Sequence, residues 1–174
     1  AWYGGAIKAM LEKDIMGGVA GNKFAPGAPT TRGMIVTMLY RMEGSPSLKR
    51  SSSKFTDVKD NAYYKNAVSW ASSNKIVTGY GASKFGPNDN ITREQMAAIL
   101  KSYAAYKQYN VSASARISQF RDFGRVSNYA FESVEWAVGE QLIGGKGNGL
   151  LDPRGKATRA EVASIFQRFL EKYE

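Results

Sequence analysis

The 174-residue sequence contains no cysteine and no histidine. These side chains supply the thiolates and imidazoles of many catalytic sites, and one or both occur in the usual zinc sites. Their absence excludes thiolate chemistry, imidazole-based catalysis and such zinc sites, so we expect neither a metal nor a cofactor. A chain without cysteine also suits an oxidising environment outside a cell, where free thiols do not persist.

Long apolar runs are absent as well. Hydrophobic residues make up 43% of the chain, which is enough for a buried core. No stretch approaches the roughly 18 consecutive apolar residues of a membrane-spanning helix. We therefore expect no membrane insertion. The length allows one compact domain or several small units that share one core.

Negative charge is scarce, because 15 acidic residues stand against 24 lysines and arginines, for a formal net charge of +9. Such a chain attracts nucleic acid, an anionic membrane surface or an anionic polysaccharide, and charge alone does not choose among them. No predicted helix concentrates Lys or Arg along one face, and no nucleic-acid-binding motif is recognisable. A basic protein- or nucleic-acid-binding scaffold is therefore the alternative function.

What the sequence does contain is a threefold internal repeat. In each copy a proline is followed five residues later by a threonine and then an arginine, in the stretches Lys23–Arg32, Lys84–Arg93 and Leu150–Arg159. The same register aligns three glycines and three aromatic residues upstream, namely Gly18, Gly79 and Gly145, and Trp2, Tyr63 and Tyr129. This repeat predicts three copies of one unit that bury their apolar faces against one another.

The second copy indicates that the unit is helix–loop–helix. Ala67, Trp70 and Ala71 recur at helical spacing, which predicts a helix over about residues 63–73. Two glycines follow and begin a loop, in which we expect Phe85 to plug the core.

The second helix of the unit is predicted to start at Thr92. Thr92 and Gln95 have the form of a capping box, and Thr158 and Glu161 look like a fuller example. Apolar residues then recur at three- and four-residue steps and predict a stripe that faces the core, formed by Met96, Ile99, Leu100 and Tyr103.

An arginine occupies the first position of this helix in every copy, as Arg32, Arg93 and Arg159. A cation there costs about 0.3–1 kcal/mol, because the helix N-terminus is itself positive. The positive pole, the unpaired backbone N–H groups and the guanidinium together form a potential anion site. Alternatively, each arginine simply reaches a nearby carboxylate, for which Asp57 and Asp122 are candidates.

Two tryptophans and three glycines allow two interpretations each. Trp70 and Trp136 lie on apolar helical faces, where such residues are more often core than ligand platform. Gly18, Gly79 and Gly145 are turn residues first, and close approach of a ligand would be a second use of the missing side chain.

With these motifs in this order, the chain resembles the S-layer homology domain family, which usually carries three tandem motifs. The family unit opens with Phe-x-Asp-Val, and its second helix begins with Ile-Thr-Arg-Ala-Glu. The first signature is similar to Phe55–Val58 and Phe120–Phe123, and the second to Ile91–Gln95 and Ala157–Glu161. The resemblance covers essentially the whole chain.

The resemblance implies a mainly all-α fold, with three helix–loop–helix repeats in a pseudo-threefold arrangement around a central helix bundle. The motifs would occupy residues 1–44, 55–107 and 120–174, joined by linkers at 45–54 and 108–119, and would form one cooperative unit. The first motif is expected to be N-terminally truncated, since its Phe-x-Asp opening is missing.

The implied function is non-covalent anchoring of a bacterial surface protein to the cell wall. The ligand would be an anionic secondary cell wall polysaccharide attached to peptidoglycan, often carrying pyruvylated N-acetylmannosamine, held in grooves between motifs. The module would be extracellular, covalently fused to a larger surface protein or cargo domain, and not an enzyme. A wall hydrolase is the enzymatic alternative and needs two suitably spaced carboxylates, but arginine-binding, capping and linker roles account for the available acids.

Carried over to this sequence, the resemblance assigns ten ligand-binding residues. The arginines would bind the acid, the aspartates would orient sugar hydroxyls or the arginines, the tryptophans would pack against the sugar, and the glycines would line the groove. They are Arg32, Arg93, Arg159, Asp57, Asp122, Trp70, Trp136, Gly18, Gly79 and Gly145.

The first copy departs from the family pattern in two further ways. Arg32 is followed by Gly33 and Met34, without the closing acid, and Ala9 stands where Trp70 is in the second copy. We therefore expect unequal sites, and those built mainly from the second and third copies are the more credible. Which copies pair to form each groove stays open at this point.

Overall fold

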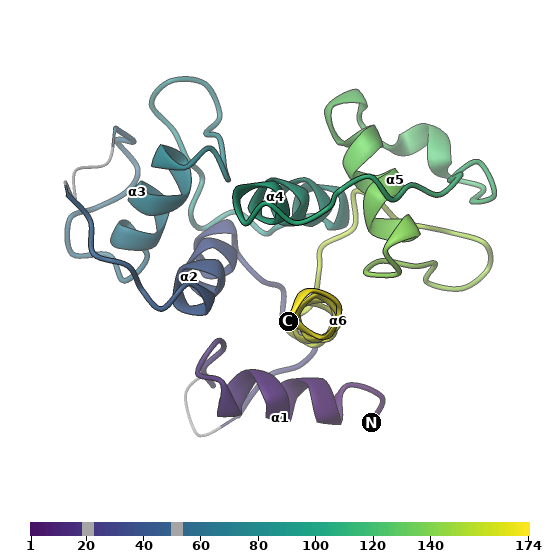
Figure 1. The fold of residues 1–174 in the computed structure, drawn as a ribbon, viewed down its shortest axis with the longest axis horizontal. Helices are drawn as coiled ribbons and strands as arrows, with labels where there is room; N and C mark the ends of the chain where they lie inside the picture. The colour runs from purple at the N-terminus through teal and green to yellow at the C-terminus, as the bar shows by residue number, and fades with distance from the viewer. Residues whose placement is uncertain (19–22, 50–53) are drawn as a thin grey trace.

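The computed structural model describes residues 1–18, 23–49 and 54–174 and shows helices joined by long loops (Figure 1). The helices are α1 (Gly4–Glu12), α2 (Arg32–Met42), α3 (Lys65–Ser73), α4 (Arg93–Tyr106), η2 (Phe123–Arg125), η3 (Asn128–Ala130), α5 (Phe131–Gly139) and α6 (Arg159–Tyr173). Within the described ranges, β-structure is limited to isolated bridges. The predicted, mainly all-α fold is confirmed. No described helix has the length and apolarity needed to cross a bilayer.

Each copy of the repeat contributes two helices, and their starts follow local signals. The first helix of the second copy, α3, begins two residues later than predicted, because Tyr64 is its N-cap. The capping box of α4 is confirmed: Thr92 Oγ1 accepts from the Gln95 amide at 3.2 Å, and Gln95 Oε1 accepts from the Thr92 amide at 3.0 Å. Local sequence therefore suffices to place these elements.

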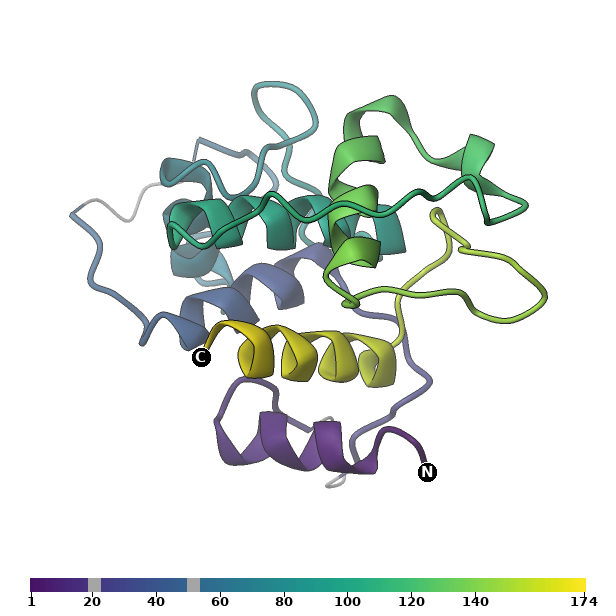
Figure 2. The same ribbon diagram turned by 45° about the vertical axis from the view of Figure 1, so that its right-hand side comes forward.

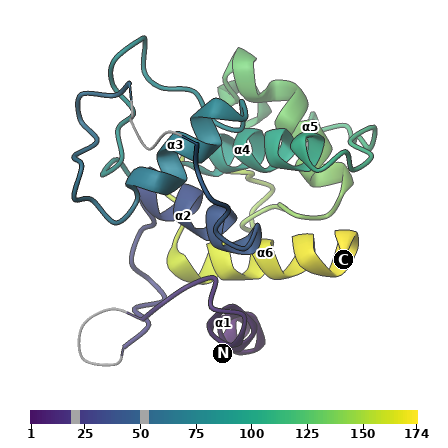
Figure 3. The same cartoon turned by 60° about the vertical axis from the view of Figure 1, so that its left-hand side comes forward.

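The helices pack in a closed ring rather than copy by copy. The first helix of each copy lies against the second helix of the preceding copy, so α3 packs on α2 and α5 on α4. The ring closes where α1 packs on α6, so the first and last helices of the chain lie side by side (Figures 2 and 3). In Figure 1 the second helices, α2, α4 and α6, lie inside and the first helices outside, which confirms the pseudo-threefold arrangement.

A triangle of backbone hydrogen bonds marks the pseudo-threefold centre. Thr30 N donates to Ala157 O at 3.0 Å, Ala157 N to Ile91 O at 3.0 Å, and Ile91 N to Thr30 O at 2.8 Å. All three residues are fully buried, and each directly precedes the threonine that caps a second helix. The triangle thus holds the N-termini of α2, α4 and α6 around one point.

The predicted apolar stripe of α4 lies in the shared core. Met96 and Leu100 are completely buried, Tyr103 is 3% exposed, and Phe85 is completely buried in the loop that precedes α4. The prediction that Phe85 plugs the core is confirmed. Burial of each such side chain contributes about 1.5–3 kcal/mol, and no single copy could bury both of its stripes alone.

The predicted linker at 108–119 packs along α5. Ala115 N donates to Glu135 O at 3.0 Å, and Ile117 is 1% exposed. A Cβ added at Gly139 would come within 2.8–3.0 Å of the Ser114 backbone, so the glycine allows this close approach. The other predicted linker, 45–54, falls partly outside the described residues.

Candidate functional site

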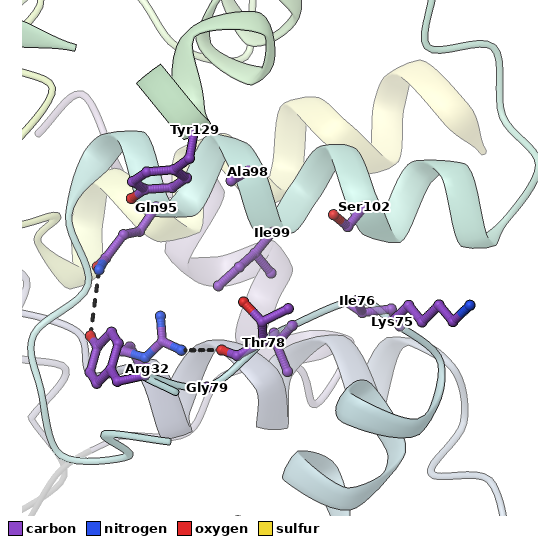
Figure 4. Close-up of a pocket in the computed structure, with 12 residues that line it drawn as sticks. Arg32, Lys75, Ile76, Thr78, Gly79, Gln95, Ala98, Ile99, Ser102 and Tyr129 are labelled. Atoms are coloured by element: carbon purple, nitrogen blue, oxygen red, sulfur yellow. Dashed lines mark hydrogen bonds between the residues drawn. The ribbon is translucent and has the colours of Figure 1, made fainter. Parts of the chain in front are cut away.

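Three grooves surround the pseudo-threefold centre, one for each second helix, with volumes of about 360, 280 and 300 Å³. Groove 1 contains Arg32, Gly79, Gln95, Ser102 and Tyr129 (Figure 4). Groove 2 contains Gly18, Met34, Arg41, Tyr63 and Arg159. Groove 3 contains Trp2, Arg93, Gly145, Glu161 and Arg168.

Every groove draws on all three copies. In groove 1, the arginine comes from the first copy, the glycine loop and the helix wall come from the second, and Tyr129 comes from the third. The other two grooves repeat this plan with the copies permuted. The pairing that the sequence left open is therefore cyclic, and the three predicted groove glycines each lie in a different groove.

Gly79 and Gly145 are required by the packing of the fold itself. A Cβ at Gly79 would clash with the Lys84 carbonyl and the Phe55 ring, and a Cβ at Gly145 would lie 3.1 Å from the ring of Phe120. The absent side chain thus makes room for the aromatic residue that opens the same motif.

The backbone N–H groups at the helix starts are already occupied, which corrects the expectation of free donors. Arg93 N donates to Gly155 O at 3.0 Å and Glu94 N to Pro153 O at 2.8 Å. The same pair of bonds recurs at the starts of α2 and α6, where the acceptors are carbonyls of the next copy's loop. A ligand could reach these donors only by displacing that loop. The N-terminus of each second helix is therefore a contact between neighbouring copies.

The guanidinium groups make a second set of hydrogen bonds between the same neighbouring copies. Arg32 Nε donates to Phe85 O and Nη2 to Thr78 O, both at 3.0 Å. Arg93 repeats the pattern with the carbonyls of Leu151 and Gly144, and Arg159 with those of Phe24 and Gly17. The three arginines are only 5–6% exposed. The alternative that they pair with Asp57 or Asp122 is wrong.

Asp57 and Asp122 hold the same loops from the other side. Asp57 accepts from the amides of Phe85 and Gly86 at 2.8–3.2 Å, and Asp122 accepts from those of Leu151 and Asp152 at 2.8 Å. Burial alone would raise the pKa of each carboxyl, but the backbone hydrogen bonds outweigh it and leave both pKa values below the ordinary one.

Neither carboxylate lines one of the three grooves. The expectation that they orient sugar hydroxyls or the arginines is therefore corrected: each acts on an arginine only through the loop residue between them. We call the three arginines and these two aspartates the clamp residues.

Trp70 and Trp136 are core residues, as their apolar helical faces indicated, and not the sugar platform that the resemblance implied. They are 2% and 1% exposed, and Trp70 lies 5.6 Å from the ring of Tyr40. Apart from Tyr80 in groove 1, the aromatic residues that reach the grooves are Trp2, Tyr63 and Tyr129, which are 69%, 63% and 63% exposed. We call these the mouth aromatics. Their alignment in the repeat was the signal that could have identified them.

Glu161 also differs from its prediction. The Thr158 hydroxyl caps α6 by accepting from the Glu161 amide at 3.2 Å, but the Glu161 carboxylate turns away from the cap. It accepts instead from Arg93 Nη1 at 3.0 Å across groove 3. The fuller capping box expected there is therefore only half formed. No group of acidic residues suited to a metal ion occurs in the described part of the chain.

Comparison with known proteins gives matches over nearly the full length. The family model of the S-layer homology domain matches residues 1–33, 54–97 and 119–163. The chain is 32% identical to an amylopullulanase from Thermoanaerobacterium thermosulfurigenes, over 98% of this chain and 9% of that protein. It is 27% identical to a surface-layer 125 kDa protein from Lysinibacillus sphaericus, over 97% of this chain and 14% of that protein.

A third relative is a cellulosome-anchoring protein from Acetivibrio thermocellus, which is 31% identical over 56% of this chain and 21% of that protein. The chain thus spans only about a tenth to a fifth of the length of these relatives.

Proposed function

Because the chain belongs to the S-layer homology domain family, we propose that it anchors a larger surface protein to a bacterial cell wall by holding an anionic wall polysaccharide in its three grooves. The module belongs to the cell surface, in keeping with its surface-layer and anchoring relatives. The similarity to an amylopullulanase covers 9% of that enzyme, so it implies no catalysis by this segment. The cargo is whatever is fused to the module in the full protein.

The observation that carries this proposal is the repeated groove, with a buried arginine at its floor and an exposed aromatic residue at its mouth. A pyranose ring has apolar faces that pack on an aromatic side chain, while its hydroxyls bond to polar groups of the wall. In groove 1, Tyr129 faces the space above Arg32, and Ser102 lies on the same wall (Figure 4). The groove volumes suit one small saccharide unit each.

An acid on the sugar fits the floor of groove 1. Arg32 uses Nε and Nη2 for the loop carbonyls, while Nη1 has no hydrogen-bond partner in the described chain. A ketal-linked pyruvate carries a carboxylate that Nη1 could bind as a charge-assisted hydrogen bond. We therefore propose a pyruvylated secondary cell wall polymer as the ligand.

Three grooves on one body suit a repeating polymer. Each groove alone can be weak, because binding of one saccharide unit raises the effective concentration of the next near a neighbouring groove. Anchoring then needs no covalent bond and no enzymatic step.

The test is retention of the purified chain on isolated wall material in three forms: intact, depleted of its attached polymer, and mildly hydrolysed to remove only the pyruvate ketal. We expect retention on the intact wall, loss on the depleted wall, and strong weakening on the hydrolysed wall. Equal retention on all three forms would overturn the proposal. Because geometry as well as charge is required, retention should also resist moderate salt better than DNA binding would.

A further inference from the structure

Each groove has a cation in its lining besides the arginine at its floor. Groove 1 contains Lys75, groove 2 contains Arg41 and groove 3 contains Arg168. We call these three exposed residues the far-end cations. In Figure 4, Arg32 and Lys75 lie at opposite ends of groove 1, with Ser102 on the wall nearer Lys75. The groove therefore offers positive charge at both of its ends.

Arg41 and Arg168 occupy the same position of the repeat, nine residues after the arginine that begins each second helix. Each is held by a hydrogen bond to the loop that follows a first helix. Arg41 Nη1 donates to Ile15 O at 3.4 Å, and Arg168 Nη1 donates to Leu142 O at 3.1 Å. The two acceptor residues are themselves equivalent in the repeat. A carbonyl oxygen carries no net charge, so both guanidinium groups keep their positive charge at equivalent places.

In groove 1 this helix position is a serine, yet the cation is kept on the opposite wall. Ser102 stands where the other two grooves have arginine. Lys75 instead comes directly before Ile76, the residue of this copy that matches the two acceptor residues. The other copies have Asp14 and Gln141 in place of the lysine, and neither lines a groove. The charge recurs although its carrier changes, which indicates a requirement for binding and not for packing.

Acidic residues do not cancel the far-end cations. Among the described residues, none of these cations has a carboxylate within 4 Å. Groove 3 contains one acid in its described lining, Glu161, and this carboxylate is bonded to Arg93 at 3.0 Å. The further cation of that groove, Lys146, pairs with Asp152 at 2.9 Å. The far-end cation of groove 3 therefore keeps its charge, as those of the other two grooves do.

The two cations of groove 1 are too far apart to share one acidic group. The wall helix α4 places Gln95 at the Arg32 end and Ser102 at the Lys75 end (Figure 4). The helix rises by about 1.5 Å per residue, so these two wall positions are roughly 10 Å apart. A charge-assisted hydrogen bond spans only about 2.7–2.9 Å. A ligand that uses both cations must therefore carry two acidic groups.

We propose that the far-end cations form a second acid subsite in each groove, so that a groove binds a polymer segment with two acidic groups in preference to a segment with one. The floor arginine receives the acid of the unit inside the groove. The far-end cation receives the acid of the adjoining unit, where the polymer leaves the groove. This inference rests on the proposed function, and it makes each groove sensitive to the spacing of acids along the polymer.

The experiment uses fragments released from the wall polymer and sorted by length and charge. The first has one saccharide repeat with one acidic group, the second has two repeats with two acidic groups, and the third has two repeats with one acidic group. The amide signal of Gly79 in a ¹⁵N-labelled chain reports groove 1. We expect the second fragment to bind about two- to fivefold more tightly than the third, as one exposed ion pair allows. High salt should remove this preference.

Substitutions at the far end of groove 1 separate the two subsites. Lys75→Gln should abolish the preference for the second fragment and leave affinity for the first unchanged, because Arg32 remains. Adding Ser102→Arg should restore the preference, since it places an arginine where the other grooves have one. The matched control, Lys75→Gln/Ser112→Arg, has the same net charge with its new arginine in the linker at 108–119, and should not restore it. Thermal unfolding verifies that each variant is folded.

Three results would overturn the inference and leave the proposed function standing: equal affinities of the unmodified chain for the second and third fragments, an undiminished preference in Lys75→Gln, or no recovery in folded Lys75→Gln/Ser102→Arg. A Gly79 signal that no fragment shifts would also overturn the inference. If retention on the intact wall is lost as well, the proposed function is overturned with it.

Discussion

The clamp arginines and the mouth aromatics recur in the same three copies, yet they are placed in opposite ways. The clamp arginines are 5–6% exposed and bond to backbone groups of the neighbouring loop. The mouth aromatics are 63–69% exposed and lie at the rim of each groove. Recurrence within one chain therefore does not separate a structural role from a binding role. Burial and bonding partners do.

The contrast predicts that changes in the clamp act on folding, whereas changes at the mouth act on binding. A binding experiment on a clamp variant alone cannot tell the two apart, because an unfolded module also fails to bind. The predicted substitutions run from the largest expected effect on stability to the smallest, and a prediction on pH follows them.

The largest effect on stability is expected from Arg93→Ala, which removes one of the clamp arginines. This change leaves Glu161 and two loop carbonyls without their partner, so we expect a loss of about 3–5 kcal/mol in the free energy of unfolding. Urea denaturation measures it, and the exposed residue Lys59 supplies the control Lys59→Ala, expected within about 0.5 kcal/mol of the unmodified chain. Arg93→Lys should recover only part of the loss. Unchanged stability of Arg93→Ala would remove the structural role of the clamp.

The acidic half of the clamp should follow with a smaller effect. In Asp122→Asn the amide group accepts less well from the backbone N–H groups of Leu151 and Asp152, so we expect a loss of about 1–3 kcal/mol. The matched control is Asp60→Asn, because the Asp60 carboxylate is 96% exposed. If both variants lose the same free energy of unfolding, the loop does not depend on Asp122.

Among the mouth aromatics, Tyr129→Ala should leave stability unchanged and weaken binding. We expect the free energy of unfolding to stay within about 0.5 kcal/mol, because the side chain is 63% exposed. Affinity for the wall polymer should fall about three- to tenfold through lost stacking, and Tyr129→Phe should retain it. Titration with soluble polymer measures the affinity. A stability loss equal to that of the clamp variants would break the comparison.

The last prediction concerns pH. The folded pKa values of Asp57 and Asp122 lie below the ordinary value, so their contribution to stability is fully present above about pH 5. It is lost as the pH falls below about 4 and through the depressed folded values. Urea denaturation of the unmodified chain and of Asp57→Asn/Asp122→Asn should therefore converge as the pH is lowered from 7 to 2. Parallel curves throughout would exclude the carboxylates as the source.

Local patterns predicted the elements well. The capping box of Thr92 and Gln95, the buried stripe of α4 and the plugging Phe85 all follow from spacing within one copy. The failures share a different property, since each concerns a partner in another copy. Glu161 resembled a capping residue in its own helix, yet its carboxylate bonds to Arg93, which lies 68 residues earlier in the chain. The bonds of the clamp arginines to loop carbonyls were missed for the same reason.

By itself, the sequence determined the helix–loop–helix unit, its threefold recurrence, and the arginine, glycine and aromatic residues placed in every copy, because caps and apolar periodicity act over a few residues. Only the tertiary structure decided that the copies interlock in a ring, that loop carbonyls fill the helix N-termini, and that one arginine is neutralised while another keeps its charge. These outcomes depend on which groups meet across copies. Contacts between residues far apart in the chain are set by packing of the whole core, which no local spacing encodes.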